Sequence, residues 1–105
     1  MKRNVDILVN NSGISGSSWA VEQEVSDWDA VINTNLRGTF LMCREVGKTM
    51  IERKCGVVIN VASVAGIIGI QKLAAYSSSK GGIIQLTKTL SQELSLIHIS
   101  EPTRL

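Results

Sequence analysis

The sequence is poor in several residue types that often carry function. Its 105 residues include one proline, one histidine, one tyrosine and two cysteines, and aromatic side chains make up only 4% of it. The formal net charge of +2 is too slight to favour nucleic acid or a membrane surface as a partner. No apolar run reaches the ~18 residues of a membrane-spanning helix, and no basic-then-apolar leader opens the chain. We therefore expect neither nucleic acid nor a membrane among its partners.

What remains is the composition of a folded domain. Hydrophobic residues make up 44% and charged residues 19%, which favours a folded protein over a disordered one. At this length the chain is at most one small domain. Cys43 and Cys55 lie twelve residues apart, a spacing that fits no common metal or redox motif. We predict that both are reduced packing residues of a cytoplasmic protein.

The hydrophobic pattern predicts two strands and two helices. Residues 5–9 and 57–61 are short apolar runs without alternation, which suits parallel strands covered on both faces. Between them, apolar residues at helical spacing predict a long amphipathic helix from an N-cap at Ser26 to about residue 53. A second helix is predicted over residues 73–94. The order β-α-β-α is one right-handed crossover plus a helix and indicates the α/β class.

Ser63, Tyr76 and Lys80 are the residues with the clearest chemical meaning. Positions i and i+4 share one face of a helix, so the Lys80 ammonium can lie beside the Tyr76 phenol. A free phenol titrates near pH ~10, and a nearby positive charge favours the phenolate, as a general acid or base requires. A Ser63 hydroxyl beside this pair could hold a carbonyl or alcohol oxygen. Taken alone, the spacing also fits a packed tyrosine and a solvated lysine.

Several other residues stand out within the predicted elements. Asn35 lies seven residues after Trp28 and falls on the apolar stripe of its helix. A buried amide is costly unless it is hydrogen-bonded, so Asn35 either bonds its own backbone or serves a site. Gly81 and Gly82 weaken the second helix by roughly 1 kcal/mol each relative to alanine, which predicts close packing there. Trp19 could cover a substrate, but a surface aromatic is the simpler interpretation.

Four motifs, in order and at matching spacing, resemble those of the short-chain dehydrogenase/reductase family over residues 6–94. They are Asp6-Ile-Leu-Val-Asn-Asn-Ser-Gly13, Asn33-Thr-Asn35-Leu-Arg-Gly38, Val58-Ile-Asn-Val-Ala-Ser63-Val-Ala-Gly66 and Tyr76-Ser-Ser-Ser-Lys80. The resemblance implies a β-α-β-α fragment of a doubly wound parallel-sheet, Rossmann-like fold. It also implies an oxidoreductase that transfers hydride between NAD or NADP and a small alcohol or ketone. The likeness is greatest to 3-oxoacyl-carrier-protein reductases and to sugar or polyol dehydrogenases.

The resemblance implies a role for each catalytic candidate. Tyr76 would be the general acid/base, and Lys80 would assist it and hydrogen-bond the nicotinamide ribose. Ser63 would hold and polarise the substrate oxygen. The Asn35 side chain would hold a water that links Lys80 to solvent. The alternative is a non-catalytic binding protein that kept the fold, but a binding role needs no such set of four residues.

The family's cofactor turn matches the end of the first predicted strand. By resemblance, Asn10, Asn11, Ser12 and Gly13 would contact the adenosine and ribose part of the dinucleotide, with Ser12 in place of the family's usual alanine. A glycine there lets the backbone approach a ligand closely. The resemblance also implies a homodimer or homotetramer built on the surfaces of residues 28–51 and 83–90.

The family pattern also implies a longer domain than this chain provides. The glycine-rich opening turn and the residue that selects NAD or NADP are expected before residue 1. Residues 1–94 are thus predicted to be a partial dinucleotide-binding and catalytic domain that is inactive alone. Residues 95–105 are predicted to be a non-native tail, because they resemble a translated sequencing adapter and because Pro102 blocks a helix. We therefore assign no function to His98.

Overall fold

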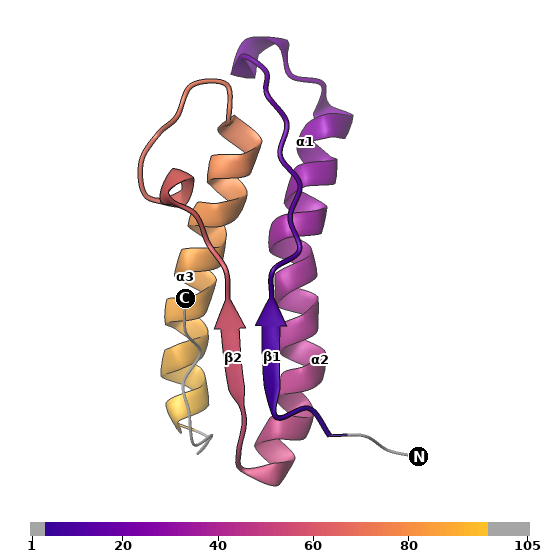
Figure 1. Ribbon diagram of the computed structural model, residues 1–105, viewed down its shortest axis with the longest axis vertical. Coiled ribbons are helices and arrows are strands. Elements are labelled where there is room, and N and C mark those ends of the chain that lie inside the picture. Colours follow the sequence, from indigo (N-terminus) through magenta and orange to yellow (C-terminus); the bar gives the residue numbers. More distant parts are fainter. Residues whose placement is uncertain (1–3, 97–105) are drawn as a thin grey trace.

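The computed structural model describes residues 4–96, and the predicted foreign tail lies almost entirely outside that range. The predicted order of strands and helices is confirmed (Figure 1). The elements are β1 (Ile7–Asn10), the 3₁₀ turn η1 (Ala20–Glu22), α1 (Val25–Ile32), the π-helical turn η2 (Asn33–Arg37), α2 (Gly38–Arg53), β2 (Val57–Asn60), the 3₁₀ turn η3 (Val64–Gly66) and α3 (Ala74–Leu96). Among the described residues, no helix is long and apolar enough to cross a membrane.

The two strands form a parallel pair. Ile7 lies opposite Val57 and Asn10 opposite Asn60. Both strands point the same way, and the loops that follow them extend to the same end of the molecule (Figure 1). A parallel pair needs a crossover between its strands, and here the helices α1 and α2 provide it. The carboxyl ends of both strands therefore open onto one edge, where α/β proteins place their ligands.

The crossover is one long helix with a π-helical turn in its middle. The expected N-cap at Ser26 is wrong, because Ser26 lies within the first turn of α1. The cap position belongs to Glu24, whose carbonyl oxygen accepts hydrogen bonds of 3.1 Å from the amides of both Asp27 and Trp28. At the other end, Lys54 adopts a left-handed conformation (φ 57°) and α2 stops at Arg53. The predicted end near residue 53 is confirmed.

The core lies on one face of the strand pair. Leu8 and Val58 point from the strands toward Cys43 and Met50 of α2, and Leu90 and Leu94 of α3 pack against the same cluster. Side chains alternate along a strand, so residues 7 and 9 point the other way. Ile7 and Val9 remain 59% and 54% exposed. The expectation that both faces are covered is therefore wrong for the described residues, because α2 and α3 pack on the same side.

Glycines allow α3 to approach its neighbours closely, as predicted. A Cβ on Gly82 would lie 2.7 Å from Cδ2 of Leu36, and a Cβ on Gly81 would lie 3.2 Å from the carbonyl oxygen of Gly66. A Cβ on Gly66 would lie 2.7 Å from the carbonyl carbon of Lys80. The loop after β2 thus packs against the backbone of α3 beside Lys80, which fixes the helix relative to the strand end.

Candidate active site

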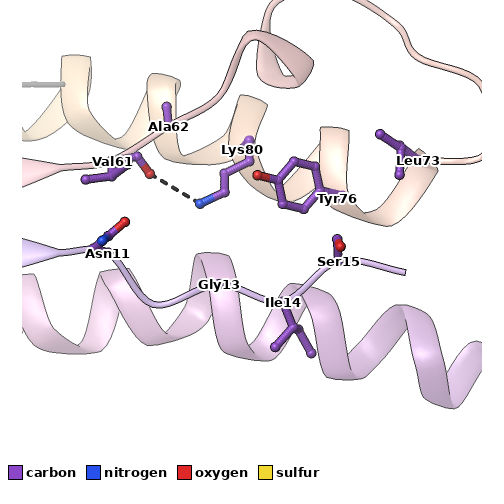
Figure 2. Close-up of a pocket in the computed structure, with 9 residues that line it drawn as sticks. All are labelled: Asn11, Gly13, Ile14, Ser15, Val61, Ala62, Leu73, Tyr76 and Lys80. Carbon is purple, nitrogen blue, oxygen red and sulfur yellow. Dashed lines mark hydrogen bonds between the residues drawn. The ribbon is translucent and has the colours of Figure 1, made fainter. Parts of the chain in front are cut away.

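A pocket of about 490 Å³ opens beyond the carboxyl ends of β1 and β2. Its walls come from the loop after β1, the end of β2 and the first turns of α3 (Figure 2). The lining residues are Asn11, Gly13, Ile14, Ser15, Val61, Ala62, Leu73, Tyr76 and Lys80. The pocket lies where the sequence predicts a ligand site.

Tyr76 and Lys80 share one face of α3 within this pocket, as their spacing predicts. The Lys80 ammonium lies 5.6 Å from the centroid of the Tyr76 ring and donates a 3.3 Å hydrogen bond to the carbonyl oxygen of Val61 (Figure 2). Lys80 is only 5% exposed, so its charge needs such a partner. Val61 is itself held by a 3.0 Å hydrogen bond from its amide to the carbonyl of Asn10. The strand ends therefore fix the position of the ammonium.

Ser63 is not among the residues that line this pocket. It lines a neighbouring, mostly apolar hollow of about 460 Å³, which shares Val61 and Ala62 with the first pocket. The Ser63 Oγ accepts a 3.2 Å hydrogen bond from the amide of Ala65 and so caps η3. A hydroxyl that accepts one hydrogen bond still carries its own proton. The Ser63 O–H therefore keeps its capacity to donate to a substrate oxygen.

Asn35 is fully buried in the π-helical turn and joins two parts of the site. Its Oδ1 accepts from the Ile14 amide, and its Nδ2 donates to the Ile14 carbonyl and to Oγ of Ser79, at 2.8, 2.8 and 3.0 Å. Both amide protons are thus used, so the side chain has no donor left for the expected water. The buried amide is satisfied by the loop after β1 rather than by its own backbone. Asn35 fixes the loop that carries Ile14 relative to α3.

The four residues at the end of β1 differ in where their side chains lie. Asn10 is buried and points into the core, where it bonds Asn60, so its side chain does not line the pocket. The physical reason is that Asn10 lies two positions after the buried Leu8 and shares its inward face. Asn11 and Gly13 line the pocket, whereas Ser12 is exposed and does not line it. The cofactor contact expected of these residues stays a prediction.

Gly13 leaves little room for a side chain where the loop crosses Lys80. A Cβ at Gly13 would lie 3.3 Å from Nζ of Lys80 and 3.5 Å from Oδ1 of Asn35. A larger residue would displace one of these groups. The loop therefore approaches the Lys80 ammonium closely at Gly13, while the expected close approach of this backbone to a ligand stays a prediction.

Sequence reasoning missed several residues of the site. Ile14, Ser15 and Leu73 line the pocket without any motif that marks them. Ser79 is one of three consecutive serines, and nothing in the motif distinguishes it from the other two. It lies about one helical turn after Tyr76. Its hydroxyl donates to the Tyr76 carbonyl at 2.7 Å and accepts from Asn35. The sequence signal that could have identified Ser79 is its position directly before Lys80 and three residues after Tyr76.

A buried polar cluster lies beneath the site. Asn10 donates to Sγ of Cys43 at 3.4 Å, and Asn60 donates to Oγ1 of Thr87 at 3.0 Å. Burial raises the pKa of the Cys43 thiol and outweighs the opposing effect of its hydrogen bonds with Asn60 and Asn10. Cys43 and Cys55 are both free thiols, as predicted. Within residues 4–96, no group of acidic, histidine or cysteine side chains could hold a metal ion.

Comparison with known proteins identifies the family and the fold. The family model for short chain dehydrogenases matches residues 1–100. The chain belongs to the short-chain dehydrogenase/reductase family, and its two strands and their helices form part of that family's Rossmann-like fold.

The relatives are similar in sequence and in structure. The chain is 44% identical over 91 residues to a 3-oxoacyl-[acyl-carrier-protein] reductase of Synechocystis. The aligned region covers 87% of this chain and 37% of the relative. It is 42% identical over 89 residues to a D-threitol dehydrogenase of Mycolicibacterium smegmatis, covering 85% of this chain and 34% of the relative. A protein of Agrobacterium tumefaciens assigned as a gluconate dehydrogenase superimposes with a TM-score of 0.89 at 40% identity. That match covers 91% of this chain and 38% of the other. The chain thus spans between a third and two fifths of these proteins.

Proposed function

We propose that this chain is the central part of an NAD(P)-dependent dehydrogenase or reductase that interconverts a small alcohol and its ketone. The observation that carries the proposal is the Tyr76–Lys80 pair. The ammonium is buried, bonded to Val61 and 5.6 Å from the phenol ring in one pocket at the strand ends. A structural lysine on a helix surface would be solvated instead. The likeness to reductases and polyol dehydrogenases supports the same chemistry.

Two features of the pocket support the binding of part of a nicotinamide dinucleotide. Gly13 leaves space beside the Lys80 ammonium that a Cβ would fill, and Asn11 adds a polar side chain to the same wall. In the proposed holoenzyme, Asn11 and Gly13 hold the ribose and adenosine side, and Lys80 holds the nicotinamide ribose. NAD or NADP, when bound, supplies or accepts the hydride.

The chain's own residues manage the proton and the substrate oxygen. In reduction, Tyr76 gives its phenol proton to the oxygen that forms from the carbonyl, and in oxidation it takes that proton back. The Ser63 O–H donates to the same oxygen, while Ala65 holds Ser63 in place. Asn35 is a positioning residue, since it fixes the loop at Ile14 against α3. A proton relay through Asn35 would have to use the remaining lone pair of Oδ1.

Two substrate classes are consistent with the proposal. The relatives include reductases of 3-oxoacyl thioesters and a dehydrogenase of a polyol, and both reactions occur at a CH–OH carbon. The alternative, a non-catalytic binding protein that kept the fold, has no use for a buried ammonium beside a phenol. We infer that the protein works in the cytoplasm, where Cys43 and Cys55 stay reduced.

We also propose that the full-length protein is a homodimer or homotetramer. Much of the apolar stripe of the long helix is buried within the chain, as at Val31, Cys43 and Met50. Phe40 and Met42 are exposed on α2 and would supply the apolar part of a subunit contact. Sedimentation that shows only monomer at micromolar concentration would contradict this proposal.

The proposal is tested in the full-length protein, meaning residues 1–94 with the coding sequence that flanks them in the gene. Tyr76→Phe removes the titrating oxygen and keeps the ring, so the fold should survive and proton transfer should not. We expect turnover to fall by ~10²–10⁴. Ser78→Ala, an exposed change two residues further along α3, is the matched control and should keep wild-type turnover. A Tyr76→Phe enzyme with a tenth or more of wild-type turnover would overturn the assignment.

The 105-residue chain alone should neither fold stably nor bind cofactor with useful affinity, and it should therefore be inactive. The face of the strand pair that carries Ile7 and Val9 is uncovered, so the chain exposes apolar surface that a stable domain would bury. Thermal unfolding and cofactor titration of the purified chain test this. A cooperative transition above ~45 °C together with micromolar cofactor binding would contradict it.

A further inference from the structure

Two loops that are far apart in the sequence meet beyond the strand ends. The Ser18 amide, in the loop after β1, donates a 3.0 Å hydrogen bond to the carbonyl oxygen of Lys72, in the loop before α3. Ser18 and Leu73 also form an isolated parallel bridge. Both loops reach the same end of the molecule (Figure 1). The loops therefore join on the side of the pocket that faces away from the sheet.

A second contact reinforces this junction. The Lys72 ammonium lies 4.9 Å from the centroid of the Trp19 ring. Tryptophan is the strongest partner for such a cation–π contact, and the distance is within the usual ~6 Å limit. Trp19 is 47% exposed, so its ring forms no part of a core. Its observed partner is the cation from the opposite loop.

The backbone of Lys72 shows that the junction constrains the loop. Lys72 has a φ of 65°, in the left-handed region that residues with a Cβ seldom adopt. Such a conformation persists where the surroundings hold it. Here the surroundings are the hydrogen bond from Ser18 and the contact with Trp19. Without them, the loop would lose the interactions that offset this conformation.

The junction is directly connected to the pocket. Leu73 follows Lys72 in the chain and lines the pocket with Ser15 and Tyr76. Figure 2 places Leu73 and Ser15 at the end of the pocket beyond the Tyr76 ring, away from Asn11. The Leu73 carbonyl accepts a 2.8 Å hydrogen bond from the Ser77 amide, so Leu73 leads into the turn of α3 that carries Tyr76.

We propose that Trp19 and Lys72 form a latch that joins the two loops at the outer end of the pocket and thereby positions the substrate beside Tyr76. The inference rests on the proposed function, because it names the part of that site that binds substrate. Trp19 and Lys72 are positioning residues and touch no reacting atom. They act through Leu73 and Ser15, whose separation the latch sets. Opening the latch should therefore weaken substrate binding and leave the chemical step intact.

Steady-state kinetics of the full-length protein test the latch, with acetoacetyl-CoA and D-threitol as the substrate probes. In Trp19→Ala and in Lys72→Met, we expect KM for the accepted probe to rise about two- to fivefold, the size of an exposed cation–π pair, with kcat changed less than that. The double variant should cost no more than either single one, because each removes the same contact. Lys72→Arg keeps a cation and should restore the wild-type KM.

Matched controls separate the latch from general effects of these substitutions. Trp28→Phe alters the other tryptophan, and Lys88→Met removes an exposed charge from α3, and neither should change KM. An unchanged KM in both Trp19→Ala and Lys72→Met would overturn the proposal. So would additive effects in the double variant, which would mean that the two residues act separately.

Amide hydrogen exchange distinguishes failure of the latch from failure of the proposed function. If the wild-type protein converts neither probe, the proposed function fails for these substrates, but the latch remains measurable. The Ser18 amide should exchange slowly in the wild type and faster in both variants, because its bond to Lys72 opens with the latch. Unaltered exchange at Ser18 in both variants would overturn the latch whatever the activity.

Discussion

The side chains of Asn10 and Asn60, fifty residues apart in the sequence, are joined by a 2.8 Å hydrogen bond from Nδ2 of Asn10 to Oδ1 of Asn60. The two residues lie opposite each other in the register of β1 and β2. Asn60 also donates to Thr87 of α3 at 3.0 Å. This buried amide pair therefore links both strands and a helix directly beneath Val61, whose carbonyl oxygen holds the Lys80 ammonium.

Removal of one member of this pair should destabilise the protein. Asn60→Ala leaves Nδ2 of Asn10 and the Thr87 hydroxyl without this partner in a buried site. We expect the free energy of unfolding, measured by urea denaturation of the full-length protein, to fall by roughly 1–3 kcal/mol. Asn33→Ala, at an exposed position, is the matched control and should have little effect. Equal losses in the two variants would contradict the structural role of the pair.

Gly66 should tolerate no side chain. Its added Cβ would lie 2.7 Å from the Lys80 carbonyl carbon and 2.8 Å from the Gly81 nitrogen, and both are backbone atoms of α3 that cannot rotate away. We expect Gly66→Ala to lower the free energy of unfolding by roughly 1–3 kcal/mol, as overpacking does elsewhere. Gly69→Ala, where a Cβ would meet nothing within 4 Å, is the control. If thermal denaturation ranks the two variants alike, the loop does not pack against α3 in this way.

The sequence predicted those parts of the site that depend on local geometry. The spacing of Tyr76 and Lys80 places them on one helix face wherever that helix packs. Likewise, Gly81 and Gly82 are costly in a helix and therefore indicate close packing, which the structure shows against Gly66 and Leu36. In both cases the prediction depends only on residues that are close together in the sequence.

Other parts depend on contacts that no local pattern contains. The Ser63 oxygen caps η3 because the chain turns immediately after it, and Asn35 bonds Ile14 because a π-helical turn aims it there. The left-handed conformation of Lys72 arises where two distant loops meet at Ser18. The inward direction of Asn10 is a different case, since strict alternation from Leu8 would have predicted it.

The Cys43 thiol should make stability depend on pH in the alkaline range. Burial raises its pKa above the ordinary value of 9.0, so the folded protein retains this proton at a higher pH than the unfolded chain does. The resulting stabilisation is fully present at pH values below the pKa of the thiol in the unfolded chain. It is lost as the pH rises from that pKa through the raised pKa of the folded protein. Between pH ~8 and ~10, the free energy of unfolding should fall more steeply in the wild type than in Cys43→Ala. Cys55→Ala leaves Cys43 in place and should keep the wild-type slope; parallel slopes in all three proteins would refute the assignment.

Ser63 has two roles that one set of variants can separate. Its oxygen accepts the Ala65 amide at 3.2 Å, and its own proton is proposed to reach the substrate oxygen. Ser63→Ala removes both functions, so we expect turnover to fall and the free energy of unfolding to drop by about 1 kcal/mol, as for loss of a cap. Cofactor affinity should stay nearly unchanged, because Ser63 does not line the pocket of Lys80 and Gly13. Ser63→Thr keeps the hydroxyl and should retain more of both turnover and stability.

The comparison of Ser63→Ala with Ser63→Asp tests the proposed direction of the hydrogen bond. An ionised aspartate can still accept from the Ala65 amide, as capping residues do, but it has no proton to donate. We therefore expect the Ser63→Asp variant to be nearly as stable as the wild type but to show little or no turnover. Urea denaturation and steady-state kinetics on the same preparations measure the two effects. If Ser63→Asp is as active as the wild type, the hydroxyl serves only to cap η3, and the substrate oxygen must be held by another group.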